Sequence, residues 1–215
     1  MKFLCLHGSG TNSSIMQSRT GALRHELGEG YQYEFVEATL PAPMAKGVEA
    51  LSSLGHGSYA FFDPDDLPNT LQNALDQLDS YIAFEGPFDA VMGFSAGAVL
   101  AAAYMLQKGR KSQKVPFRCA IFLSSAECAE ELRYPGLDHT DRNNLIRVPT
   151  AHIWGLHDDT APLGGKDLSC ICDPTNRLVL VHDGGHELPR IGHLTEAAHI
   201  IRRAIRLSRL AGCTD

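Results

Sequence analysis

Six short apolar segments, mostly separated by helical stretches, constrain the fold of this chain more than any other feature. Several are continuous apolar runs, which is the pattern of strands covered on both faces. Alternating strands and helices predict an α/β fold with a doubly wound, mainly parallel sheet and helices on both faces. The expected strands are Lys2–Leu6, Tyr33–Glu37, Ala90–Met92, Cys119–Leu123, Thr150–Trp154 and Leu178–His182, and the expected helices are Ser14–Leu27, Pro68–Phe84, Ser95–Lys108, Lys166–Ile171 and Thr195–Leu210.

Length and composition limit the classes of protein to consider. A chain of 215 residues fits a single domain, 1–215, with a sizeable core. The net charge of -6 argues against nucleic acid as a main partner. No apolar run reaches membrane-spanning length, and Phe3–Leu6 is too short for a signal peptide. The six cysteines lack the spacing of zinc or redox motifs, so we expect reduced thiols and a cytoplasmic protein. Nothing in the sequence indicates an oligomeric state.

The segment Gly93-Phe94-Ser95-Ala96-Gly97 has the G-x-S-x-G pattern of a nucleophile elbow. It follows an apolar run and opens an alanine-rich stretch, so strand, sharp turn and helix follow one another as that motif requires. The two glycines would avoid collisions with neighbouring backbone, and the Ser95 hydroxyl would project from the top of the sheet. The alternative is an ordinary glycine-rich turn with a helix-capping serine.

A serine hydroxyl is a weak nucleophile without a neighbouring base. Among the ten histidines, His186 lies just past the last expected strand, at the edge where parallel sheets carry their chemistry. An acid should follow the preceding strand and orient the imidazole. Asp158 and Asp159 both lie there. We favour Asp158 for its G-x-x-D-x-x-x-P spacing, and the reverse assignment to Asp159 remains an alternative.

Backbone N–H groups would complete the site by forming an oxyanion hole. One should come from Ala96, directly after the serine. The other should come from Ser9, in the loop His7–Asn12 that follows the first strand. A phosphate-binding loop is the alternative for this segment, but both glycine-rich phosphate motifs are absent from it.

The connection from Thr39 to Pro68 is unusually long and carries several prolines, glycines and aromatic residues. Long connections are commonly functional or disordered, and the aromatic residues argue against disorder. We interpret residues 39–68 as a lid-like substrate loop in which Met44, Phe61 and Phe62 contact the substrate. The alternative is a surface excursion whose aromatic residues pack on the core.

Segments spread over nearly the whole chain together resemble the fungal family of serine hydrolases (FSH) within the α/β-hydrolase superfamily. The run from Gly86 to Gly97 is the most specific part. The resemblance implies an α/β-hydrolase fold and matches the family's triad to Ser95, Asp158 and His186. Ala96 departs from the family, where many members carry Gln, so substrate contacts of a longer side chain would be lost. The matching segments are Phe3–Asn12, Gly86–Asp89, Gly93–Ala98, Ile121–Ser125, Pro149–Pro162 and Val181–Pro189.

The FSH family includes esterases and thioesterases that release polyketides from fungal synthases, as in lovastatin biosynthesis. The resemblance therefore implies a serine hydrolase that cleaves acyl thioesters or esters through an acyl-serine intermediate, without a metal or an organic cofactor. The expected partners are a small-molecule acyl substrate and an acyl carrier protein, in polyketide biosynthesis. The alternatives are a small-molecule carboxylesterase or lactonase, an acyltransferase, and a non-catalytic α/β-hydrolase-like binding protein.

Overall fold

The computed structural model describes residues 1–51, 53, 57–128 and 146–211. Its centre is a parallel six-stranded sheet with the strand order β2-β1-β5-β6-β7-β8. Every strand expected from the sequence is present, with ends shifted by at most two residues. The strands are β1 (Lys2–Leu6), β2 (Gln32–Val36), β5 (Ala90–Phe94), β6 (Cys119–Leu123), β7 (Thr150–Gly155) and β8 (Arg177–His182).

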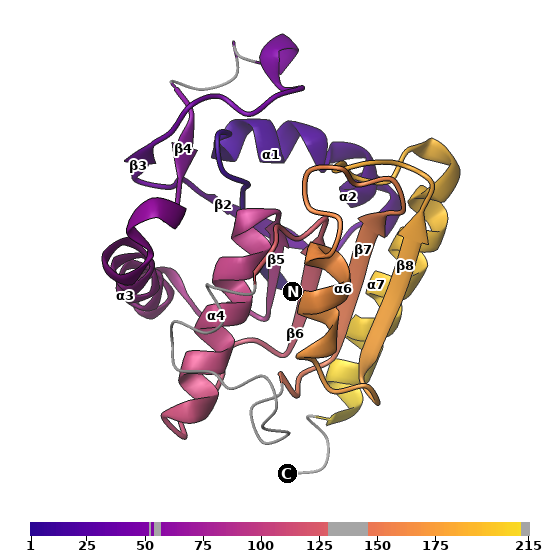
Figure 1. Ribbon diagram of the computed structural model, residues 1–215. Coiled ribbons are helices and arrows are strands. Elements are labelled where there is room, and N and C mark those ends of the chain that lie inside the picture. The colour runs from indigo at the N-terminus through magenta and orange to yellow at the C-terminus, as the bar shows by residue number, and fades with distance from the viewer. Residues whose placement is uncertain (52, 54–56, 129–145, 212–215) are drawn as a thin grey trace.

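Helices cover both faces of the sheet, which confirms the doubly wound α/β fold (Figure 1). One face carries α3 (Leu67–Glu85), α4 (Ala96–Arg110) and α6 (Gly164–Cys170). The other carries α1 (Ser13–Arg19), α2 (Gly21–Leu27) and α7 (Ile191–Ala211). Within the described residues, none of these helices is long and apolar enough to span a bilayer.

Alternate side chains of each central strand enter two different cores, as the period of a β-strand requires. On β1, Leu4 and Leu6 pack under α3 and α4, whereas Phe3 and Cys5 pack under α1, α2 and α7. Cys119 on β6 also belongs to the second core and is fully buried. The central strands are therefore covered on both faces, which explains their continuous apolar sequences.

The expected helix Ser14–Leu27 is two helices in the structure. Helix α1 ends at Arg19 and α2 begins at Gly21, with Thr20 between them. The Thr20 hydroxyl donates to the carbonyl of Met16 at 2.8 Å, and such back-bonding side chains bend or interrupt helices. Gly21 follows directly and further weakens helical continuity. The break places Arg19 at the end of a helix instead of in the middle of one.

The connection after β2 contains two more short strands that the sequence did not indicate. Strands β3 (Leu40–Pro41) and β4 (Tyr59–Ala60) pair antiparallel, and Tyr59 also bridges to Thr11. This pairing ties the start and end of the long connection to the loop after β1. It therefore brings this segment to the carboxyl edge of the main sheet.

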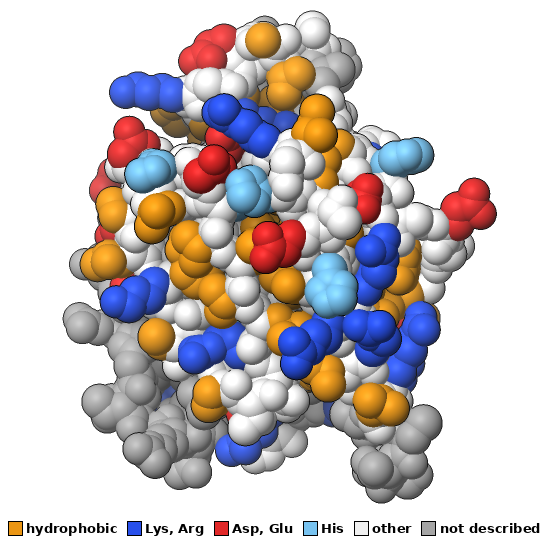
Figure 2. All heavy atoms as spheres, turned by 90° about the vertical axis from the view of Figure 1, so that its right-hand side faces the viewer, with side chains coloured by type: hydrophobic (Ala, Val, Ile, Leu, Met, Phe, Trp, Pro, Cys, Tyr) orange, Lys and Arg blue, Asp and Glu red, His pale blue; other side chains and the backbone are white. Residues whose placement is uncertain are grey.

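Strand β8 forms one edge of the sheet, and its outward side chains are only partly covered. Val179 and Val181 are 45% and 43% exposed. On the molecular face beyond this edge, apolar side chains are interspersed with Lys, Arg and His (Figure 2). Charges distributed in this way discourage association through an exposed strand edge.

We expect His152 on β7 to make stability fall in acid. His152 is 1% exposed, and burial lowers its pKa to about 3. Between that value and about 6.5, its pKa in an unfolded chain, the unfolded state binds one more proton than the folded state. The free energy of unfolding should therefore fall by up to about 1.4 kcal/mol for each unit that the pH drops through this window.

Urea unfolding of wild type and His152→Gln at pH 7.5, 6 and 5 measures this contribution. The variant should show a shallower loss of stability in acid, while the exposed His25→Gln should match wild type. Equal acid dependence of wild type and His152→Gln would show that His152 is protonated without opposing folding.

Candidate active site

Ser95 lies in the sharp turn between β5 and α4, at the carboxyl edge of the sheet. Its backbone has φ 53° and ψ -121°, a left-handed conformation that non-glycine residues rarely adopt. A Cβ on Gly93 would lie 2.5 Å from the carbonyl oxygen of Gly97, and a Cβ on Gly97 would run into the carbonyl of Leu6. Both glycines are therefore required where the G-x-S-x-G pattern places them.

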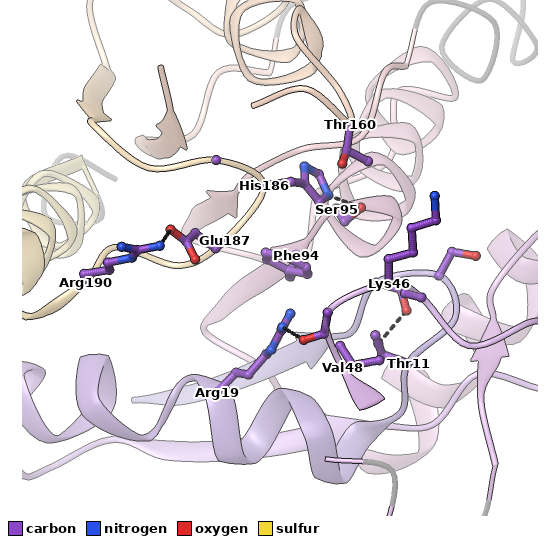
Figure 3. A pocket seen from close by; sticks show the side chains of 15 residues that line it. Thr11, Arg19, Lys46, Val48, Phe94, Ser95, Thr160, His186, Glu187 and Arg190 are labelled. Atoms are coloured by element: carbon purple, nitrogen blue, oxygen red, sulfur yellow. Dashed lines mark hydrogen bonds and ion pairs between the residues drawn. The ribbon is translucent and has the colours of Figure 1, made fainter. Parts of the chain in front are cut away.

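The structure brings Ser95, His186 and Asp158 into one chain of hydrogen bonds. Ser95 Oγ lies 2.9 Å from His186 Nε2, and His186 Nδ1 lies 2.7 Å from Asp158 Oδ2 (Figure 3). A carboxylate at Nδ1 holds the proton there, which leaves Nε2 free to accept the proton of the serine hydroxyl. The arrangement can therefore activate Ser95 as a nucleophile.

Asp158 is held by its own loop as well as by the histidine. Its Oδ1 accepts hydrogen bonds from the backbone N–H groups of Thr160, at 3.0 Å, and Ala161, at 2.8 Å. The Asp158 residue is buried, whereas Asp159 is exposed. The structure thus places Asp158, and not its neighbour, against the imidazole. These two N–H donors were not predicted from the sequence, although an aspartate two residues before a threonine is a common turn signal.

The loop that carries His186 is fixed from two sides. At the end of β7, a Cβ on Gly155 would run into the carbonyl of Gly184, so the absence of a side chain lets the two loops touch. On the other side, the Ser124 hydroxyl donates to the carbonyl of Glu187 at 2.8 Å. Ser124 follows β6 and was not singled out from the sequence. Together these contacts position the imidazole over Ser95.

The loop after β1 approaches Ser95 closely enough to supply a backbone donor. A Cβ on Gly8 would lie 3.1 Å from the Cβ of Ser95, and Ser9 lines the same cleft as Ser95. Ala96 is the first residue of α4, where N–H groups lack carbonyl partners within the helix. The N-terminal end of the helix also favours negative charge.

A buried histidine supports this loop from beneath. His7 Nδ1 contacts the carbonyl of Gly8 at 2.8 Å, and its Nε2 accepts from the backbone N–H of Ala38 at 3.1 Å. Burial lowers the pKa of His7, although the Glu37 carboxylate 3.0 Å from Nε2 opposes that shift. The neutral ring can then bridge the ends of β1 and β2.

Ser95 opens into a cleft of about 730 Å³ (Figure 3). One wall comes from the long connection, whose residues 45–48 are joined to the β1 loop by the hydrogen bond from Ala45 N to Gly10 O at 2.9 Å. Phe94 forms part of the floor, and its ring lies 5.5 Å from that of His186. The cleft lining is Gly8, Ser9, Thr11, Arg19, Ala45, Lys46, Gly47, Val48, Phe94, Ser95, Thr160, Gly185, His186, Glu187 and Arg190.

The three residues expected to contact substrate lie outside this lining. Phe62 is 4% exposed and packs in the core beneath α3 and α4. Phe61 packs against the same core, with its ring 4.8 Å from that of His7. Met44 is 44% exposed. The wall of the cleft uses the residues that directly follow Met44.

No group of three or more His, Cys, Asp or Glu side chains in the described ranges is arranged to hold a metal ion. The charged side chains that line the cleft are Arg19, Lys46, Glu187 and Arg190.

Comparison with known proteins gives consistent matches along the chain. The model of the serine hydrolase (FSH1) family matches residues 1–198. Esterase FPY3 of Fusarium mangiferae is 39% identical over 200 residues, which cover 89% of each chain. Esterase alnB of Emericella nidulans is 34% identical over 268 residues, covering 92% of this chain and 93% of alnB.

Two solved structures show the same architecture at low sequence identity. Esterase PE8 has a TM-score of 0.65 at 18% identity, and the match covers 94% of this chain and 92% of PE8. Acyl-protein thioesterase 2 of Zea mays has a TM-score of 0.63 at 18% identity, covering 95% of this chain and 93% of its own. These likenesses show the α/β-hydrolase fold.

Two glycines of α4 should respond in opposite ways to substitution by alanine. In Gly97→Ala the new Cβ meets the carbonyls of Leu6 and His7, so β1 and α4 must separate and stability should fall. In Gly109→Ala the new Cβ has nothing within 4 Å, so stability should rise by about 0.5–1 kcal/mol. Urea unfolding of both variants provides the comparison. A Gly97→Ala protein as stable as wild type would mean that the helix and the strand can separate at no cost.

Proposed function

The chain belongs to the serine hydrolase (FSH1) family, and from this premise we propose that Ser95, His186 and Asp158 form its catalytic triad. In this proposal Ser95 is the nucleophile, His186 is the general base and acid, and Asp158 orients the imidazole. The observation that carries it is the continuous chain of hydrogen bonds from Asp158 to Ser95 at a strained turn. Such a constellation is recognised by its geometry and the roles of its members, whatever their order in the sequence.

The first half of the reaction transfers the acyl group to the enzyme. Ser95 Oγ attacks the carbonyl carbon of the substrate while His186 Nε2 takes the hydroxyl proton. The carbonyl oxygen becomes negative, and the N–H groups of Ala96 and Ser9 donate to it. The tetrahedral intermediate then collapses and expels the thiol or alcohol, which receives its proton from His186. The product of this half is an acyl-serine.

The second half releases the acid. A water molecule loses a proton to His186 as it attacks the acyl-serine carbonyl, and the same two N–H groups stabilise the second oxyanion. Expulsion of Ser95 Oγ, which takes back the proton, regenerates the enzyme. The carboxylate of Asp158 stabilises the imidazolium formed in each half.

The substrate that we propose is an acyl thioester, in the first instance a polyketide bound to an acyl carrier protein. The resemblance to a family that includes polyketide-releasing thioesterases supports this, as does a structural neighbour that is an acyl-protein thioesterase. The second candidate is a small-molecule carboxylic ester or lactone, which the esterases among the sequence relatives favour. Both reactions use the same acyl-serine.

We also propose that the described part of the long connection, residues 39–51, 53 and 57–68, covers the bound substrate; residues 52 and 54–56 of the predicted lid lie outside the described residues. Its residues 45–48 form one wall of the cleft, and Gly10, with φ 70°, lets this wall pack on the β1 loop. A Cβ at Gly10 would lie 2.5 Å from the carbonyl oxygen of Pro43. The contact to substrate is thus expected from residues 45–48 more than from the core-packed Phe61 and Phe62.

We expect Ser95→Ala to abolish turnover without unfolding the protein. The change removes one hydroxyl and keeps the Cβ, so the packing and the backbone strain at φ 53° are unchanged and the melting temperature should stay close to that of wild type. Loss of such a nucleophile costs several orders of magnitude in kcat. Ester hydrolysis and labelling by a fluorophosphonate probe measure the effect. Turnover within about tenfold of wild type, or equal labelling, would contradict the role of Ser95.

Asp158→Asn and Asp159→Asn form a matched pair that tests the acid. An amide at Asp158 can donate to Nδ1 and so favours the wrong tautomer of His186, which costs about 10⁴ in kcat in a comparable triad. The exposed Asp159 should tolerate the same change within about twofold. Steady-state kinetics of both variants decides between them, and the reverse ranking would move the role to Asp159.

A further inference from the structure

The cleft beside Ser95 gathers positive charge in a chain whose net charge is -6. We propose that Arg19 and Lys46 form a subsite for an anionic group of the substrate, a carboxylate or a phosphate. The subsite presupposes the proposed function, because it takes the substrate to occupy the cleft that contains Ser95. To the proposed function, the subsite adds a preference of the cleft for anionic substrates.

Arg19 is held in a fixed position with donors to spare. It is the last residue of α1, is half-buried, and reaches from the helix toward Phe94 (Figure 3). Its Nη2 donates to the carbonyl of Gly47 at 3.0 Å. A guanidinium has five N–H donors, so most of them remain for another acceptor. In the part of the chain that the structure describes, no carboxylate oxygen lies within 4.0 Å of this cation.

Lys46 adds a second positive charge from the wall formed by residues 45–48. Its side chain is exposed and extends toward the part of the cleft where Ser95 and Thr160 lie (Figure 3). It too lacks a carboxylate within 4.0 Å among the described residues. The cleft therefore presents two uncompensated cations from two different segments.

The other two charged side chains of the cleft lining, Glu187 and Arg190, are paired with each other. Arg190 Nη2 lies 2.9 Å from Glu187 Oε1, so these two groups largely cancel. Asp158 is bonded to His186 and lies behind the imidazole, with its side chain 4% exposed. The uncompensated charge that meets an incoming substrate is consequently positive.

This arrangement favours an anionic substrate over a neutral one of the same shape. A substrate that enters the cleft displaces water from the Arg19 guanidinium, and loss of that hydration is unfavourable unless another acceptor replaces it. Carboxylate and phosphate oxygens match the planar guanidinium and form charge-assisted hydrogen bonds with it. The bond from Arg19 to Gly47 fixes the side chain before binding, which reduces the entropy lost on binding.

Three pantetheine thioesters test the subsite and locate the charge. The neutral reference is pentanoyl-pantetheine. Glutaryl-pantetheine places a carboxylate on the acyl group, and pentanoyl-phosphopantetheine places a phosphate on the leaving group. The readout is the ratio of kcat/KM for each anionic thioester to that for the neutral one. Wild type should prefer one anionic thioester by about tenfold, the size of one charge-assisted hydrogen bond, and added salt should lower the preference.

Variants of Arg19 and Lys46 test whether these two residues cause the preference for an anionic thioester. Arg19→Gln and Lys46→Gln should each lower the ratio, and the double variant should bring it close to one. Arg19→Lys should keep more of the preference than Arg19→Gln, because it retains the charge. Arg203→Gln is the matched control: Arg203 is exposed on α7, outside the cleft lining, and its change alters net charge equally.

Several results would overturn the subsite while leaving the hydrolase proposal intact. One is equal turnover of all three thioesters by wild type. Another is a preference that survives in the double variant. A third is an equal loss for every thioester with a lower melting temperature, which would show that Arg19 only holds residues 45–48 in place.

If wild type turns over none of the thioesters, measurements of ligand binding to Ser95→Ala distinguish the subsite proposal from the hydrolase proposal. The amide analogues of the same three compounds are used, and their Kd values replace kcat/KM. Tighter binding of an anionic analogue, lost in Arg19→Gln, would support the subsite although the hydrolase proposal had failed. Equal Kd values would overturn the subsite as well.

Discussion

The direct contact between the backbone of α4 and the carboxyl end of β1 is the constraint on which the site depends. Gly97 has no room for a side chain against the carbonyls of Leu6 and His7. This contact sets the start of the helix, and with it the strained turn that holds Ser95. It also brings the loop after β1 beside the serine. Strand order reverses between β1 and β5, so both loops open at the switch point where α/β sheets bind ligands.

A second close backbone contact fixes the other half of the site. Gly155, at the end of β7, touches the loop that carries His186, while Ser124 anchors the same loop from the end of β6. Four neighbouring strands thus each contribute a group at the same edge of the sheet, and the hydrogen bonds from Asp158 to Ser95 join three of their loops. The chemistry is assembled from parts far apart in sequence because parallel strands end together.

The features that depend on local sequence could be predicted from sequence patterns. All six main strands followed from apolar runs, and the glycines around Ser95 signalled the turn. The pairing of His186 with Asp158 agrees with their expected places after neighbouring strands. The features that depend on three-dimensional packing could not be predicted from the sequence. The pairing of β3 with β4 and the support from Ser124 join segments far apart in the chain, which no local pattern encodes. For the same reason, the sequence left open whether Phe61 and Phe62 contact the substrate or pack on the core, and the structure shows that they pack on the core. The helix break at Thr20 has local causes, the Thr20 hydroxyl and Gly21, which the helical pattern of the surrounding residues outweighed.

The division of the interior into two cores has a consequence for the position of the serine itself. Phe94, the residue before Ser95, packs with α1, α2 and α7, whereas Ala96, the residue after it, packs with α3, α4 and α6. Ser95 therefore lies on the seam between two separately packed layers. Because protein interiors are close-packed, a loosened layer shifts whatever it holds. The position of the Ser95 hydroxyl depends on both layers. A loss of packing in either layer should therefore displace the hydroxyl, even when the other layer is intact.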